Sequence, residues 1–165
     1  MAYRFRFGRL SQVVAPAMWF LFFLPSHLAL ASEREPGAGE AVERIQLVVD
    51  RLRVQLGIPE AVAVSVVPSV ALVVSVEAPS DSSGTFRLSI EDRFLAQLNS
   101  DEIDAAVAHE LGHVWVFTHH PYLQTERLAN QIAMRVVRRE SLISVYEKVW
   151  RLGGTKGDLV NFLGP

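Results

Sequence analysis

Two histidines four residues apart, with a glutamate directly after the first, stand in the otherwise apolar segment AAVAHELGHVW. An α-helix turns by about 400° over four residues, so His109 and His113 point from nearly the same face, one turn apart. Two imidazoles placed in this way can bind one zinc ion. Glu110 is rotated by about 100° from His109, so it is not a ligand but can polarise a water in the open position of the metal.

The same three residues have an ordinary structural interpretation. His109 and His113 could be core histidines satisfied by hydrogen bonds, with Glu110 merely exposed. That arrangement would bury two imidazoles and a carboxylate among apolar residues without evident partners, at a cost of several kcal/mol. A bound metal compensates that cost, and the pattern is the HExxH motif that is typical of zinc peptidases. We therefore predict one Zn²⁺ ion bound by His109 and His113, with Glu110 as the catalytic base.

Such a site needs three protein ligands and an open fourth position. We predict Glu126 as the third ligand, because the break after the motif helix centres on His119 and His120, about midway between His113 and Glu126. In an antiparallel helical hairpin those two residues lie at the same height. Asn130, one turn further on, could accept the free N–H of a ligating histidine. The alternative is a Glu126 that simply faces solvent, as most helical glutamates do.

His119 is a second candidate for the third ligand, because it follows His113 at the spacing of the metzincin pattern HExxHxxGxxH. Val116 replaces the glycine of that pattern. A β-branched residue there lets the helix continue, which would place His119 about 240° around the helix from His113. Met134 lies inside a helical pattern and offers no Met-turn. The sequence favours Glu126.

The elements that position these residues can be predicted from hydrophobic periodicity. Helical spacing covers residues 41–57, and three β-branched runs follow at 61–67, 70–78 and 85–90. The runs predict a small, mostly antiparallel three-stranded sheet, with the second or third run as its exposed edge. A short helix is expected at about 91–98.

The motif helix should begin at Asn99 or Ser100, since Asn99 and Glu102 have capping-box spacing, and should end near Thr118. After Pro121, a second helix is predicted over 122–140, and a further one from about 141 to 153. The fold class is α+β, with the sheet packed on the N-terminal helix, the motif helix and the helix that carries Glu126.

The N-terminus has the features of a signal peptide. Three arginines precede the apolar run 13–31, which ends in the small-x-small pattern Ala29-Leu30-Ala31. We predict a signal peptide over 1–31, a linker over 32–40, one domain over 41–165, and export to the periplasm or the medium. The alternative is an uncleaved N-terminal membrane anchor, which is the sole membrane association we expect.

The composition limits the classes of partner that we expect the protein to bind. The net charge of −2 is small and the basic residues are scattered, which argues against a nucleic-acid partner. The chain has no cysteine, so an exported domain of this size would depend on its core or on a bound metal for stability. The HExxH motif instead predicts a peptide or protein substrate.

The segment LNSDEIDAAVAHELGHV resembles the HtpX/CAAX-prenyl-protease family, where an acidic helix start leads into AHELGH. The downstream ERLANQIA is similar to the glutamate segment of that family and to the ExxAN pattern of ImmA/IrrE-type metallopeptidases. Over roughly residues 84–140 the chain resembles gluzincin metallopeptidases, and its order of elements is similar to their stand-alone cores, the minigluzincins. The resemblance implies a zincin-like fold, zinc bound by His109, His113 and Glu126, and Glu110 as general base and acid.

Several features depart from these families. Asn130 replaces their usual aspartate, the gap from His113 to Glu126 is shorter, and the multi-span membrane helices of the prenyl proteases are missing. The predicted function is an exported zinc-dependent peptidase; the rival is a non-catalytic exported zinc-binding domain derived from a peptidase core. The sequence assigns no transition-state stabiliser, for which the candidates include His119, His120, Tyr122 and Tyr146.

Overall fold

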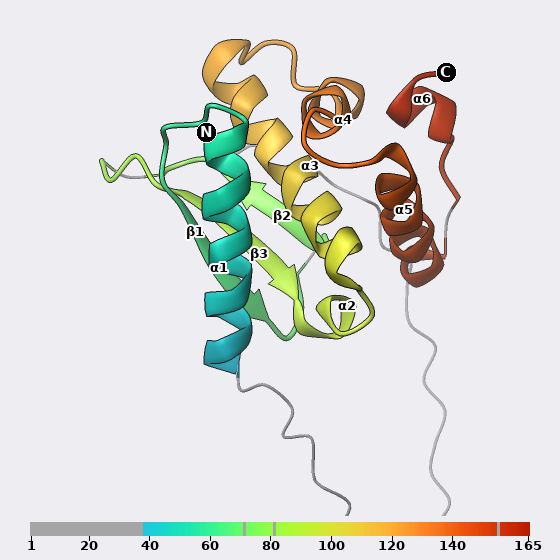
Figure 1. Cartoon of the computed structure of the whole chain (residues 1–165), viewed down its shortest axis with the longest axis horizontal. Coiled ribbons are helices and arrows are strands. Elements are labelled where there is room, and N and C mark those ends of the chain that lie inside the picture. Colours follow the sequence, from blue (N-terminus) through green and yellow to red (C-terminus); the bar gives the residue numbers. More distant parts are fainter. Residues whose placement is uncertain (1–37, 71, 81, 155) are drawn as a thin grey trace, which may run out of the picture.

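The computed structural model describes residues 38–165 except 71, 81 and 155 (Figure 1). The predicted signal peptide and most of the predicted linker lie outside the described residues. The elements in chain order are α1 (Ala38–Gln55), β1 (Val62–Val67), β2 (Val74–Glu77), β3 (Phe86–Glu91), α2 (Asp92–Leu95), α3 (Ser100–His119), α4 (Glu126–Ala133), α5 (Arg139–Gly153) and α6 (Leu159–Leu163). The predicted α+β class with a three-stranded sheet is confirmed.

The sheet is mixed, whereas we predicted a mostly antiparallel one. Its strand order is β1-β3-β2, with β3 parallel to β1 and antiparallel to β2. The reason is the connection between β1 and β2, which spans residues 68–73 and begins with Pro68. It carries the chain past the place where β3 later inserts, so the first two strands do not form a hairpin.

Strand β2 is an edge of this sheet and β3 is its centre. Of the two predicted edge candidates, the second run is therefore correct and the third is wrong. The amide of Glu91 donates to the carbonyl of Val73, so these two residues are a hydrogen-bonded pair. Hydrogen-bonded and non-hydrogen-bonded residue pairs then alternate along β2 and β3. The main-chain groups of Val74 and Val76 consequently face away from β3, toward the open side of the edge.

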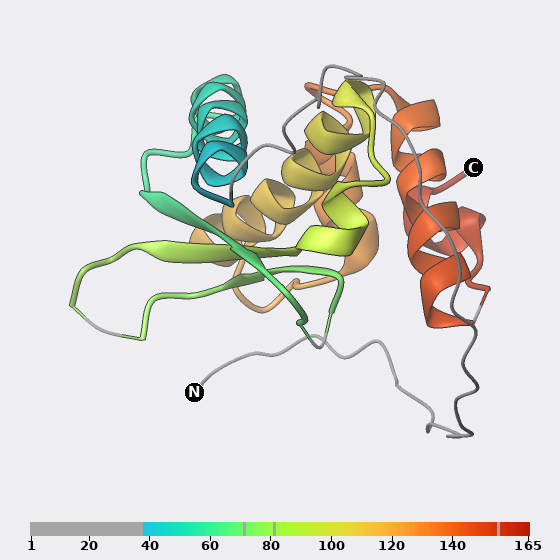
Figure 2. The same cartoon turned by 90° about the horizontal axis from the view of Figure 1, so that it is seen from below.

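Helices α1 and α3 lie side by side on one face of the sheet, as Figure 2 shows. Helix α1 packs along β1, and α3 packs beside the edge strand β2. The core fills the space between these two layers, and its fully buried side chains include Ile45, Val49, Leu52, Leu88, Ile90, Phe94, Val107 and Leu111. The motif helix is thereby held at the edge of the sheet.

Helix α3 starts as predicted. The Asn99 side chain accepts from the amide of Glu102 at 3.0 Å, and the Glu102 carboxylate accepts from the amide of Asn99 at 2.8 Å, which completes the capping box. Lys148 of α5 also donates to the Glu102 carboxylate, so the same carboxylate joins α5 to the start of α3.

The predicted second helix over 122–140 is wrong in its length. The hydroxyl of Thr125 accepts from the amide of Leu128, and this cap starts α4 only at Glu126. Helix α4 ends at Ala133. Turns follow to residue 138, and α5 then begins as a separate helix.

Helix α4 packs mainly on α3, and α6 packs on α4. Figure 1 shows α5 and α6 on the side of α3 away from α1. Among the described residues, no helix is both long and apolar enough to span a membrane.

Candidate metal centre

Three of the predicted site residues meet where α3 and α4 adjoin. Ligand atoms of His109, His113 and Glu126 all lie within 4.8 Å of one another. The Nε2 atom of His109 lies 3.3 Å from Oε2 of Glu126, and Nε2 of His113 lies 3.6 Å from Oε1. The side chains are mostly buried, with exposed fractions of 16%, 7% and 24%.

This trio can hold a metal ion. With bonds of about 2.0–2.1 Å, a tetrahedral zinc site places its ligand atoms about 3.3 Å apart. The separations of Glu126 from the two imidazoles are close to that value. Two imidazole nitrogens and one carboxylate are also a common ligand set for catalytic zinc. The residues present therefore fit the ion that the sequence predicts.

Glu126 reaches the histidines because α4 approaches α3 closely. A Cβ added to Gly112 would overlap the carbonyl oxygen of Ala129 and lie 2.8 Å from its carbonyl carbon. No residue but glycine fits at that contact without moving one of the helices. The Thr125 cap starts α4 at Glu126, so the ligand stands on the first turn of the helix.

The ionisable groups of the site shift one another's pKa values. Burial disfavours the charged form of His109, but the hydrogen bond to Glu126 and the nearby Glu110 carboxylate outweigh it and raise its pKa to about 9. Burial also disfavours ionised Glu126, yet the hydrogen bonds from His109 and His113 dominate and hold its pKa far below the usual range. Glu126 is therefore ionised at neutral pH and its charge is balanced by protonated His109, whose proton a metal ion would replace.

Glu110 lies beside the trio and against the edge strand. It is only 7% exposed, and burial raises its pKa, against the opposing effect of His109 and His113. Its carboxylate accepts a hydrogen bond from the amide of Val76, one of the outward-facing amides of β2. The predicted base is therefore placed between the trio and the edge of the sheet.

Asn130 is fully buried, and both its amide oxygen and its amide nitrogen have hydrogen-bonding partners. Its Oδ1 lies 2.8 Å from Nδ1 of His109. Its Nδ2 donates to the Tyr146 hydroxyl at 2.7 Å and to the carbonyl of Phe162 at 3.0 Å. The contact with His109 is the one that the sequence predicts, whereas the other two reach α5 and α6.

Tyr146 also donates from its hydroxyl to Oε2 of Glu126, at 3.4 Å. Its ring meets the His109 ring edge-on at 5.8 Å. Burial, followed by the Glu126 charge, raises the pKa of Tyr146 well above its usual value, so the hydroxyl keeps its proton. Among the candidates for a stabilising group, which also included several arginines, Tyr146 makes a hydrogen bond with Glu126 of the trio.

His119 lies away from the trio. Its ring stacks on Trp115 at 4.1 Å with an angle of 6° between the planes, and its Nδ1 lies 2.9 Å from the Trp115 carbonyl. His120 also packs against Trp115, and Tyr122 is 98% exposed in the loop after α3. The structure thus brings Glu126, and not His119, to the two histidines.

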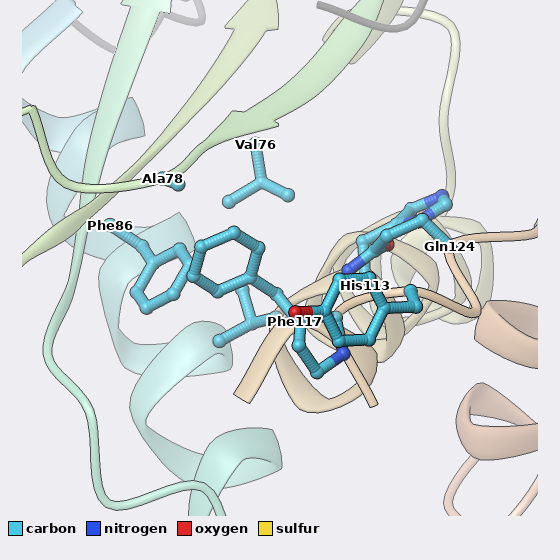
Figure 3. A pocket seen from close by; sticks show the side chains of 9 residues that line it. Val76, Ala78, Phe86, His113, Phe117 and Gln124 are labelled. Atoms are coloured by element: carbon cyan, nitrogen blue, oxygen red, sulfur yellow. The ribbon is translucent and has the colours of Figure 1, made fainter. Parts of the chain in front are cut away.

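A pocket of about 140 Å³ opens beside His113, between β2 and α3 (Figure 3). Val76, Ala78 and Phe86 form its sheet side, and Phe117 of α3 packs edge to face on Phe86. The other lining residues are Val114, Pro121, Tyr122 and Gln124. An apolar cavity of this size accommodates a group as large as a benzene ring.

Three groups of the site were not predicted from the sequence: the Gly112 contact, the Tyr146 contact with Glu126, and the Phe162 carbonyl. Gly112 stands inside the motif, so its position facing α4 could have been inferred from helical spacing. Tyr146 was one of several candidates, and no signal in the sequence distinguished it from the others. A main-chain carbonyl carries no signal in the sequence at all.

No protein-family model matches the chain, and no curated protein sequence matches it. Among solved structures, the chain is similar to the metallopeptidase zymogen of Pyrococcus abyssi abylysin, with 16% identity and a TM-score of 0.48. The match covers 69% of this chain and 99% of the abylysin chain.

Proposed function

We propose that the chain is a zinc-dependent peptidase of gluzincin type that cleaves within peptide chains. The observation that supports this most directly is the convergence of His109, His113 and Glu126, with a buried Glu110 beside them. In this proposal the trio holds the ion, and Asn130 orients His109 through the contact at Nδ1. When bound, zinc supplies the Lewis acidity that polarises a peptide carbonyl and acidifies water.

Glu110 supplies the proton transfers. Its carboxylate removes a proton from the attacking water and then delivers it to the amine that leaves. Burial raises the pKa of Glu110, which makes it a better proton acceptor than an exposed carboxylate. The amide of Val76 holds the carboxylate in the position between the trio and the strand.

Substrate binds as an added strand on β2. The outward amide of Val74 and the outward carbonyls of Val74 and Val76 offer main-chain hydrogen bonds to an extended peptide, while the amide of Val76 donates to Glu110. The apolar pocket beside His113 receives one of its side chains. An extended peptide with an apolar residue next to the cleaved bond is therefore the substrate class that fits.

Metal analysis together with a cleavage assay tests this function. The wild-type protein should carry one zinc per chain and cleave peptides, whereas His109→Ala, His113→Ala and Glu126→Ala should lose the metal. Glu110→Gln should retain it and lose cleavage by a factor of about 10² or more, because one proton-transfer group is gone. Cleavage that survives Glu110→Gln would remove that residue from its role. Stoichiometric zinc without any cleavage would favour the rival function, a non-catalytic zinc-binding domain.

We also propose export through residues 1–31. The three arginines ahead of an apolar run, with the small-x-small pattern at Ala29 to Ala31, support this proposal. Expression of the full chain followed by mass analysis should give a mature protein that begins at Ser32 outside the cytoplasm. A full-length product in the membrane fraction would indicate the anchor instead.

A further inference from the structure

The trio is joined to the C-terminal helices by a chain of hydrogen bonds that closes on itself. Nδ1 of His109 meets Oδ1 of Asn130, and Nδ2 of Asn130 donates to the Tyr146 hydroxyl. That hydroxyl lies 3.4 Å from Oε2 of Glu126, which in turn lies 3.3 Å from Nε2 of His109. The ring thus contains two residues of the trio, His109 and Glu126, joined through Asn130 and Tyr146.

The carbonyl of Phe162 fixes the orientation of Asn130. A carbonyl can only accept, so the group 3.0 Å from it must be the amide nitrogen of Asn130. The amide oxygen then faces Nδ1 of His109. This carbonyl is free to accept because it belongs to the last turn of α6, where helix carbonyls have no partner within the helix.

The orientation of Asn130 in turn selects the tautomer of His109. An amide oxygen accepts only, so Nδ1 of His109 carries the proton that it shares with Asn130. Nδ1 keeps this proton, so the proton that a metal ion can replace is the one on Nε2, the atom that faces Glu126. A main-chain group 53 positions away in the sequence therefore prepares His109 to bind a metal.

We propose that the Tyr146 hydroxyl and the Phe162 carbonyl are positioning groups of the metal site, supplied by α5 and α6. Tyr146 holds the carboxylate of Glu126, and Phe162 sets His109 through Asn130. This inference rests on the proposed function, because it concerns the same zinc site. It makes the C-terminal helices a part of the site, although none of their side chains is in the trio.

The ring also explains why an asparagine stands at position 130. An ionised aspartate could accept from His109, but it could not donate to Tyr146 or to the Phe162 carbonyl. It would instead place a negative charge 3.0 Å from a carbonyl oxygen in a fully buried position. Asn130→Asp should therefore weaken zinc binding, even though the charged side chain is the better partner for a histidine considered alone.

The test compares zinc dissociation constants, measured by competition with a chelating dye, across five full-length proteins. Tyr146→Phe and Asn130→Asp should each bind zinc about 10- to 100-fold more weakly than the wild type, which is the usual effect of losing an outer partner. Ser82→Ala removes the hydroxyl of an exposed serine between β2 and β3 and should leave the constant unchanged.

General loss of stability is separated by Val145→Ala. Val145 is buried in α5 next to Tyr146, so this variant should lower the melting temperature of the metal-free protein without changing zinc affinity. Binding by Tyr146→Phe and Asn130→Asp that equals the wild type, in a wild type that binds zinc and cleaves, would overturn the positioning role alone. A wild type that binds no zinc would overturn the proposed function, and this inference with it.

Discussion

The two sides of the trio differ in character. Toward α5 and α6, the polar atoms of Asn130 meet His109, Tyr146 and the Phe162 carbonyl, and the space is closed. Toward β2, the walls are apolar, a pocket is open, and Glu110 contributes the carboxylate. The closed side fixes geometry and the open side leaves room for a reacting molecule. A site that binds a metal and also acts on a substrate requires both.

Gly112→Ala should have the largest effect, because it displaces α4, which carries both Glu126 and Asn130. The added Cβ overlaps the backbone of Ala129, so α4 must move away and carry Glu126 with it. We expect loss of zinc binding and a decrease of about 1–3 kcal/mol in the free energy of unfolding of the metal-free protein, measured by urea titration. Gly39→Ala is the matched control: a Cβ there meets nothing within 4 Å, so zinc binding should not change. Zinc affinity that survives Gly112→Ala would contradict the close-approach explanation.

Ala78→Leu should change peptide cleavage on the open side of the trio without changing zinc binding. The larger side chain fills the pocket beside His113, so cleavage of peptides with a large apolar side chain should fall by about 10- to 200-fold relative to peptides with a small one. Zinc affinity should equal that of the wild type. The measurement is the ratio of kcat/KM for the two peptide sets. An equal loss for both sets would show that the pocket does not select substrates.

The stability of the metal-free protein should depend on pH, because the pKa values of His109 and Glu126 are shifted in the folded state. The pKa of His109 is raised from 6.5 to about 9 in the folded state, so its contribution to stability is complete below about pH 6.5 and is lost as the pH rises through 9. Glu126 has a lowered pKa, so its contribution is present above about pH 4.5 and is lost in acid. Melting temperatures should therefore decline between pH 6.5 and 9.5. The melting temperature of His119→Gln should decline over this range as much as that of the wild type, and the melting temperature of His109→Gln should decline less. Equal declines in the two variants would rule out His109 as the cause.

The smallest effect is expected at the start of α4. Thr125→Ala removes the hydroxyl that accepts from the amide of Leu128, at a cost of about 1 kcal/mol in unfolding free energy. Thr125→Ser keeps a hydroxyl and should restore most of that loss. Because Glu126 is the next residue, zinc affinity should fall slightly in the alanine variant and recover in the serine variant. A serine variant as unstable as the alanine variant would show that the cap is not the cause.

Glu126 lies beside His109 and His113, as a third ligand would have to, but the reasoning that predicted this position was incomplete. The sequence places the helix break at His119 and His120 and resumes the helix at 122. In the structure the helix resumes only at Glu126, because the Thr125 cap overrides the apolar pattern of the preceding loop. The contact depends instead on the glycine at position 112, which lets the two helices approach. Helical periodicity describes spacing along one helix and contains no information on the distance between two.

What the sequence by itself determined is local. Helical geometry places His109 and His113 on one face, and the capping box joins Asn99 to Glu102, because each involves residues within one turn of each other. The tertiary structure decided that β2 is the edge, and that Tyr146 and the Phe162 carbonyl meet Asn130 across 16 and 32 residues. Contacts over such separations depend on how whole elements pack, which the periodicity of a single segment does not encode.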